Sequence, residues 1–198
     1  MNTPWWQHSI TLEGDIVKKT PLPWCVVDFQ KAQVSVEFFK KRFWEIVPET
    51  TVSHSSDTGY VVSQKFIEWK QLSEMKVEDI SYKQLQDFLQ FIDTCIFLLF
   101  YEGKYFDIIG FQRDTPFENI SWEWFLQKLS RHFQVVKNFF SSSNFILSPT
   151  GTVHFVDNIA NYGIYDTNRN KNIPMQCYRM GLLLRYRMQI LQAMSARS

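Results

Sequence analysis

The stretch Asn144-Phe-Ile-Leu-Ser-Pro-Thr-Gly-Thr-Val-His-Phe-Val-Asp157 decides how the rest of the chain is interpreted. The apolar run 145–147 and the run 152–156, which contains Val153, Phe155 and Val156, predict two short strands, and the Pro-Thr-Gly segment between them predicts a turn. Because a hairpin brings its ends together, we expect the Asn144 amide and the Asp157 carboxylate to face one point. Oxygen ligands of this kind suit Mg²⁺ held with a nucleotide phosphate. The alternative is that Asn144 merely flanks a turn and Asp157 lies on the surface.

Size and composition exclude several classes of protein. The chain has 198 residues, of which 45% are hydrophobic and 17% aromatic, enough for one domain or two closely packed lobes. A net charge of +1 lacks the basic excess of a nucleic-acid-binding protein, so we expect no nucleic-acid partner. The most apolar run, 88–101, is too short to span a bilayer, so we expect no membrane association.

The three cysteines are Cys25, Cys95 and Cys177, and no two of them form a CxxC pair. This arrangement argues against a disulfide framework or a structural zinc site and fits a reducing compartment. The polar, tryptophan-bearing start of the chain does not have the pattern of a secretory leader. We therefore expect a cytoplasmic protein.

The first 70 residues combine short apolar runs with one amphipathic helix. Runs bounded by turn residues predict strands, and apolar residues at helical spacing, closed by Pro48, predict the helix. The expected strands are residues 9–12, 15–19, 50–53 and 60–67, and the expected helix is residues 31–47.

The remaining residues predict a mainly helical region. Ser81 and Gln84 have the spacing of a capping box, which opens a strongly amphipathic helix. The expected helices are residues 81–101, 121–140 and 175–194, with the 144–157 hairpin embedded between the last two. We therefore expect an α+β fold in a single domain, 1–198, with a β-rich lobe at 1–70 and a helical lobe at 71–198.

This order of elements resembles the protein-kinase-like fold, and two intervals add to the resemblance. In that family a strand lysine binds the nucleotide phosphates and pairs with a glutamate on the following helix. Lys18 lies on the 15–19 strand, and Glu37 follows nineteen residues later. The family's metal-binding aspartate typically follows the catalytic-loop asparagine by thirteen residues, which is the interval from Asn144 to Asp157.

The resemblance covers residues 9 to about 160 and implies a two-lobed fold with ATP and Mg²⁺ as ligands. The end of the second hairpin, Gln64-Lys-Phe-Ile-Glu68, resembles the hinge whose backbone binds adenine. The residues that the resemblance assigns to the nucleotide are Lys18, Glu37, Gln64, Phe66 and Glu68, and those that it assigns to the metal are Asn144 and Asp157.

Two of these residues have plainer interpretations. Lys18 could be a solvent-facing strand lysine, in which case its neighbour Lys19 points the other way. Glu37 could pair with Lys41, four residues on, as helix-surface ions commonly do.

The chain departs from the family where the family performs catalysis. The glycine-rich phosphate loop is missing, because Gly14 is the only glycine before Lys18. Phe139 stands five residues before Asn144, where the family has its catalytic aspartate, and a phenyl ring accepts no proton. Ser141-Ser-Ser143 fills the loop instead, and serine is a poor general base near neutral pH.

Three functions are consistent with these residues. The leading hypothesis is a degenerate kinase-like domain that binds a nucleotide with Mg²⁺ weakly, or acts as a pseudokinase through a protein partner. The second is an active ATP-dependent phosphotransferase with a rewired catalytic loop, since phosphoryl transfer rests mostly on positioning and charge neutralisation. The third is a ligand-free interaction or scaffold protein in which the fold persists and aromatic side chains fill the cleft. Whether the protein is an enzyme stays open.

Overall fold

The structure is a computed structural model of an α+β protein with a small antiparallel sheet. In the part of the chain that it describes there are four α-helices. Two compact units divide the chain: Met1–Lys70 with Phe145–Ile164, here the first unit, and Gln71–Asn144 with Tyr165–Ser198, the second unit. The residues described are 8–23, 25, 27–68, 70–106, 108, 120–132, 138–148, 150–157, 165–166 and 173–197, with backbone only at 128–132 and 165–166.

The first unit is built on a four-stranded antiparallel sheet in the order β1-β2-β4-β3. The predicted strands are confirmed, and Gly14 closes the first hairpin with a φ of +62°, a conformation that glycine adopts without strain. The strands are β1 (His8–Glu13), β2 (Ile16–Pro21), β3 (Thr50–Ser55) and β4 (Gly59–Lys65).

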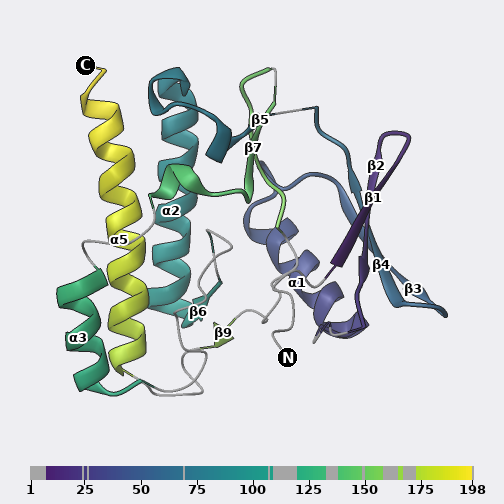
Figure 1. Cartoon of the computed structure of the whole chain (residues 1–198), viewed down its shortest axis with the longest axis horizontal. Helices are drawn as coiled ribbons and strands as arrows, with labels where there is room; N and C mark the ends of the chain where they lie inside the picture. The colour runs from purple at the N-terminus through teal and green to yellow at the C-terminus, as the bar shows by residue number, and fades with distance from the viewer. Residues whose placement is uncertain are drawn as a thin grey trace. The chain divides into compact units, whose positions relative to one another are not determined.

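Helix α1 (Phe29–Arg42) covers one face of this sheet (Figure 1). The Asp28 side chain accepts a hydrogen bond from the backbone N–H of Lys31 and so caps the start of the helix. Below the helix, Val27 and Ala32 pack with Tyr60 and Val62 of β4 in one buried cluster. These contacts define the covered face of the sheet.

The predicted end of this helix was wrong. Phe43 leaves the helical conformation, with φ −134° and ψ 33°. The backbone N–H groups of Ile46 and Val47 both donate to the carbonyl of Phe43, so a tight turn, and not a further helical turn, precedes Pro48.

The predicted hairpin at 144–157 is confirmed as β7 (Phe145–Leu147) and β8 (Val153–Phe155), paired in the register Phe145 to Phe155. β5 (Lys70–Gln71) is the third strand of this small sheet. The Phe155 ring lies 5.4 Å from the ring of Phe39 on α1, and its N–H donates to the carbonyl of Ile46. The hairpin is thus fixed against the end of α1 within the first unit.

The second unit is mainly helical, and α2 (Tyr82–Glu102) packs along α5 (Ile173–Ser195) (Figure 1). The predicted capping box is confirmed, because Ser81 and Gln84 exchange hydrogen bonds at the start of α2. The other elements are the 3-10 turns η1 (Leu72–Glu74), η2 (Val77–Asp79) and η3 (Phe139–Ser141), the strands β6 (Lys104–Tyr105) and β9 (Tyr165–Asp166), and α3 (Trp122–His132).

The expected helix at 121–140 was too long. α3 is described over Trp122–His132, and Phe139–Ser141 form a separate 3-10 turn, η3, where the end of the helix was predicted. The Asn138 side chain accepts from the backbone N–H of Phe140 and so caps this new turn. Residues 133–137 lie outside the described residues.

Candidate functional site

Lys18 and Lys19 are neighbours on β2 but lie on opposite faces of the sheet. Lys18 is paired across the strands with Thr11 and Ser63, on the polar face. Its ammonium donates to the Glu13 carboxylate at 2.5 Å, and both side chains are substantially exposed, at 37% and 58%. Lys18 therefore belongs to a surface ion pair of the β1–β2 hairpin.

Lys19 lies on the covered face, opposite the fully buried Val62. Its Nζ donates a hydrogen bond to the carbonyl oxygen of Val156 at 2.6 Å, next to Asp157. Burial lowers the pKa of the Lys19 ammonium below its ordinary value, while the charge of the Asp157 carboxylate acts in the opposite direction. The first unit thus brings a partly buried cation and a carboxylate together at the end of the β7–β8 hairpin.

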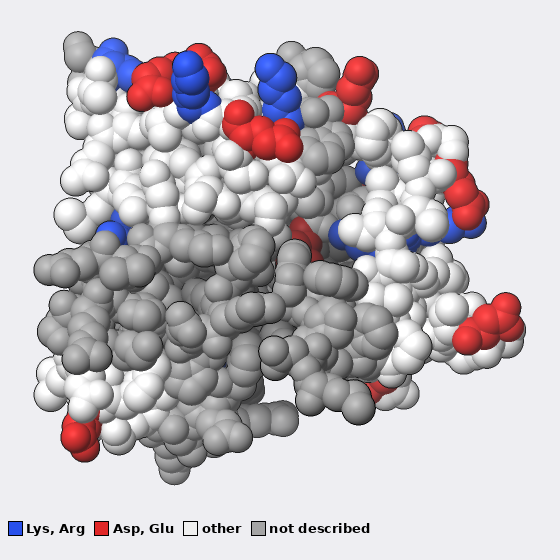
Figure 2. Space-filling model, in the orientation of Figure 1, with Lys and Arg blue, Asp and Glu red and all other residues white. Residues whose placement is uncertain are grey.

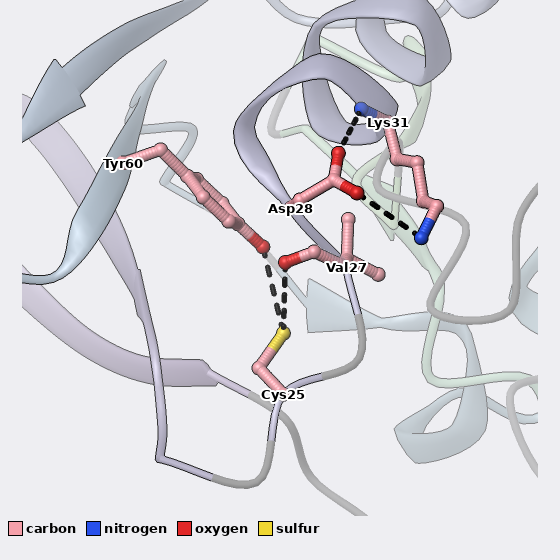
Figure 3. A network of polar contacts seen from close by, with 5 residues as sticks. All are labelled: Cys25, Val27, Asp28, Lys31 and Tyr60. Atoms are coloured by element: carbon pink, nitrogen blue, oxygen red, sulfur yellow. Dashed lines mark hydrogen bonds and ion pairs between the residues drawn. The ribbon is translucent and has the colours of Figure 1, made fainter.

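His8, Tyr60 and Cys25 form a polar cluster on the same face of the sheet. His8 Nε2 and the Tyr60 hydroxyl are 2.6 Å apart, and the Cys25 thiol lies 3.5 Å from that hydroxyl. Figure 3 shows the thiol between Tyr60 and the carbonyl oxygen of Val27, just before the start of α1. Burial raises the pKa of the Tyr60 phenol above its ordinary value, so the hydroxyl keeps its proton near neutral pH.

The pKa of His8 is lowered to about 4, first because burial disfavours the imidazolium and second because the positive charge of Lys19 is close. His8 is therefore neutral at pH 7. His8 and Lys19 lie on the same face of the β1–β2 pair, since Ile10 is opposite Lys19 and His8 is two residues along β1 from Ile10.

Glu37 lies on the exposed side of α1. Its carboxylate accepts a hydrogen bond from Gln33, one helical turn earlier, at 3.2 Å. The residues of α1 that are buried are Ala32, Ser35, Val36 and Phe39. Glu37 thus does not lie on the side of α1 that packs inward.

The residues of the expected hinge have mixed surroundings. Gln64 is buried, and its amide nitrogen donates to the Thr50 hydroxyl at 3.3 Å. The backbone N–H of Phe66 donates to the carbonyl of Asp15 at 2.7 Å, so this N–H is already used within the chain. Glu68 is exposed.

Asn144 belongs to the second unit and has a structural contact there. Its side-chain nitrogen donates to the carbonyl of Ile108 at 3.2 Å, and the Ser142 hydroxyl donates to the same carbonyl at 3.1 Å. The side-chain oxygen of Asn144 takes no part in this contact, and the residue is 7% exposed.

Phe139, to which the resemblance assigned the place of a catalytic aspartate, is a core residue of the second unit. Its ring lies 5.2 Å from that of Phe88 and 6.1 Å from that of Tyr186, and the side chain is fully buried. The phenyl ring of Phe139 has no polar group, so this side chain cannot accept or transfer a proton.

The remaining candidates for a site are the charged side chains and the potential metal ligands in the rest of the described chain. On the face shown in Figure 2, positive and negative side chains are interspersed. Across the described ranges, no three His, Cys, Asp or Glu side chains are grouped so that they could hold a metal ion. No helix among the described residues combines the length and apolarity needed to cross a membrane.

The sequence of the chain matches no protein-family model and no curated protein.

The sequence interpretation missed Lys19, His8 and Tyr60. In the structure β4 alternates the buried Tyr60, Val62 and Gln64 with more exposed residues, and the residue of β2 opposite Val62 shares that buried face. The sequence hides this alternation, because Val61 stands between Tyr60 and Val62. Nothing in the sequence paired His8 with Tyr60, fifty-two residues apart.

Proposed function

We propose that the protein is a degenerate kinase-like domain that binds a nucleotide with Mg²⁺ and does not transfer phosphate efficiently. The single observation that carries this proposal is the Lys19 ammonium on the covered face of β2, next to Asp157 after β8. A lysine that binds phosphate and an aspartate that binds the accompanying metal are two essential parts of nucleotide sites in that family. We assign to Lys19 the role expected for Lys18.

The surroundings of Lys19 support a ligand with an apolar part. Ile10 lies opposite Lys19 and Leu12 opposite Val17, so all four residues are on the same face. Ile10 and Leu12 are 68% and 56% exposed, so the face that is covered at Tyr60 and Val62 of β4 is open at β1. A planar base could stack on these side chains while its phosphates reach Lys19.

The Asp157 carboxylate and the Lys19 ammonium suit Mg²⁺ bound together with a phosphate. Mg²⁺ usually takes one or two carboxylates and completes its coordination with phosphate oxygens and water. Asp157 supplies one carboxylate, and phosphate oxygens and water would complete the coordination. The metal would neutralise phosphate charge, while Lys19 would hold and orient the phosphate.

Two observations favour binding over catalysis. Phe139 is packed in the aromatic core where the family has a proton acceptor. Glu37 lies on the exposed side of α1, so the lysine–glutamate pair of active kinases has no counterpart in Lys19 and Glu37. An active phosphotransferase would need another group to orient the attacking hydroxyl.

A partner-binding scaffold is the second candidate, and one observation favours it. Phe97, Phe100 and Tyr101 on α2 are 49%, 70% and 68% exposed. Their rings contact one another, with Phe97 4.7 Å and Phe100 4.9 Å from Tyr101. An exposed aromatic cluster of this kind suits a protein partner.

Thermal unfolding with ATP or ADP, with and without Mg²⁺, separates these functions. A ligand that binds the native state at a hundred times its Kd stabilises it by about 2.7 kcal/mol, a shift of several degrees in Tm. We expect a Mg²⁺-dependent shift in the wild-type protein that Asp157→Asn and Asp157→Ala remove. Asp57→Ala, in the exposed β3–β4 turn, is the control and should keep the shift.

Prolonged incubation with Mg²⁺ and ATP then tests for catalysis. Absence of ADP and of phosphorylated protein agrees with the proposal, whereas turnover that Asp157→Asn abolishes would establish the phosphotransferase. Identical Tm values under all conditions would contradict nucleotide binding and favour the scaffold.

A further inference from the structure

His8 and Lys19 are diagonal neighbours on the covered face of the sheet. Their strands pair with His8 opposite Pro21 and Ile10 opposite Lys19, so His8 lies two residues along β1 from the residue that faces Lys19. Diagonal neighbours in an antiparallel pair are about 7–8 Å apart, within reach of a common ligand. After burial, the positive charge of Lys19 is the second cause of the lowered pKa of His8.

Tyr60 determines which ring nitrogen of His8 carries the proton. The phenol has one proton, and two acceptors are near it: His8 Nε2 at 2.6 Å and the Cys25 sulfur at 3.5 Å. An imidazole nitrogen is a much stronger acceptor than a thiol sulfur, so the hydroxyl donates to Nε2. The neutral ring of His8 therefore carries its proton on Nδ1.

Among the described residues, none forms a hydrogen bond with Nδ1 of His8. His8 is only partly buried. Its hydrogen bonds with described residues, to Tyr60 and Cys25, both use Nε2. His8 thus offers one N–H donor, and the hydrogen bond between its Nε2 and the fully buried Tyr60 fixes the orientation of the ring.

The position of this donor along the sheet matches the phosphate end of the proposed ligand. Leu12 and Ile10 provide the apolar part of β1, and His8 follows them, each two residues and about 6.8 Å from the next. Lys19 lies opposite Ile10, between the apolar end and His8. A nucleotide with its base towards Leu12 would extend its phosphates past Lys19 to His8.

We infer that the Nδ1–H of His8 donates a hydrogen bond to a phosphate oxygen of the nucleoside diphosphate or triphosphate that Lys19 binds. His8 and Lys19 together supply, from side chains, the donors that a glycine-rich loop supplies from its backbone. This inference rests on the proposed function and adds a residue that recognises the phosphate tail.

Two substitutions of His8 by amide side chains distinguish a role as hydrogen-bond donor to phosphate from a structural role. Asparagine places its NH₂ near the position of Nδ1, whereas glutamine places its amide near the position of Nε2. His8→Asn therefore keeps a donor for phosphate and loses the contact with Tyr60. His8→Gln keeps a partner for Tyr60 and loses the donor.

Calorimetric titration with Mg·ADP and with adenosine measures the effect. We expect His8→Gln to weaken Mg·ADP binding about tenfold or more, as loss of a hydrogen bond to a charged group does. His8→Asn should bind Mg·ADP within about threefold of the wild-type protein. Adenosine, which has no phosphate, should bind equally to all three proteins.

The ¹⁵N chemical shifts of His8 in the wild-type protein provide a readout that does not depend on any variant. We expect Nδ1 to be protonated and Nε2 unprotonated, with the Nδ1 shift changing when Mg·ADP is added and not when adenosine is added. A proton on Nε2 would overturn the inference.

Equal affinities of the wild-type protein and His8→Gln for Mg·ADP would overturn the role of His8 and leave the proposed function standing. Equal losses in His8→Asn and His8→Gln would show a structural role and also overturn it. Absence of Mg·ADP binding by the wild-type protein would overturn the proposed function and, with it, this inference.

Discussion

Lys19 Nζ donates a hydrogen bond to the carbonyl oxygen of Val156, although 137 residues separate the two in the chain. This contact joins the central strand β2 to the end of the β7–β8 hairpin. It also brings Asp157 close enough for its charge to act on the Lys19 ammonium. The aromatic contacts of the same hairpin hold it in position, and they lead to the first prediction.

Phe155→Ala should lower the free energy of unfolding by about 3–5 kcal/mol, because the ring is fully buried and its removal leaves a cavity. The ring contacts Phe39 at 5.4 Å and Phe145 at 5.2 Å. Urea denaturation measures the change. Trp44→Ala is a control in the same unit, because that ring is 72% exposed and its loss should cost less than about 1 kcal/mol. Equal effects of the two substitutions would contradict the packing of the hairpin on α1.

Asn144→Ala should lower the free energy of unfolding by about 1–3 kcal/mol, because it removes a buried donor to the carbonyl of Ile108. The Ser142 hydroxyl still reaches that carbonyl, so we expect a value in the lower half of this range. Ser143→Ala, at the partly exposed neighbouring position, should change stability by less than about 0.5 kcal/mol. If Asn144→Ala changed the free energy of unfolding as little as Ser143→Ala does, the hydrogen bond to the carbonyl of Ile108 would not contribute to stability.

The stability of the protein should fall as the pH is lowered from about 6.5 to about 4, in part because of His8. The unfolded chain binds a proton on His8 near pH 6.5, whereas the folded protein does so only near pH 4. Between these values the unfolded state binds more protons, so acid favours unfolding. The contribution of His8 is complete above pH 6.5 and lost at about pH 4.

The size of this contribution is about 1–3 kcal/mol, reduced from the full effect of the shift because His8 is partly exposed. Burial also lowers the pKa of His154, so part of the pH dependence remains when His8 is replaced. The difference between the wild-type protein and His8→Gln, measured by urea denaturation at pH 7 and pH 4.5, isolates His8. Parallel pH profiles for the two proteins would rule out a buried, neutral His8.

Most elements of the fold could be predicted from the sequence, because their signals are local. Alternating apolar residues and Gly14 defined the first hairpin, and Ser81 with Gln84 defined the start of α2. The ends of helices were less predictable. The turn after Phe43 and the cap at Asn138 depend on hydrogen bonds that helical periodicity does not indicate.

The candidate site was harder to predict, because it depends on which face of a strand is covered. A shift of one residue moves a side chain to the other face, and this difference separates Lys18 from Lys19. The interval from Lys18 to Glu37 matched the family pattern, but a spacing carries no information on the face to which each side chain belongs. The pairing of His8 with Tyr60 depends on the order of strands in the sheet, which only the folded chain supplies.

The most direct measurement is calorimetric titration of Mg·ADP into the wild-type protein, Lys19→Met and Lys18→Met. The two substitutions remove the same charge at adjacent positions of one strand, Lys18 on the polar face and Lys19 on the covered face. We predict that the wild-type protein and Lys18→Met bind with similar affinity and that Lys19→Met loses at least about tenfold. Loss of binding in Lys18→Met with retention in Lys19→Met, or no binding by the wild-type protein, would contradict a nucleotide site at Lys19 and Asp157.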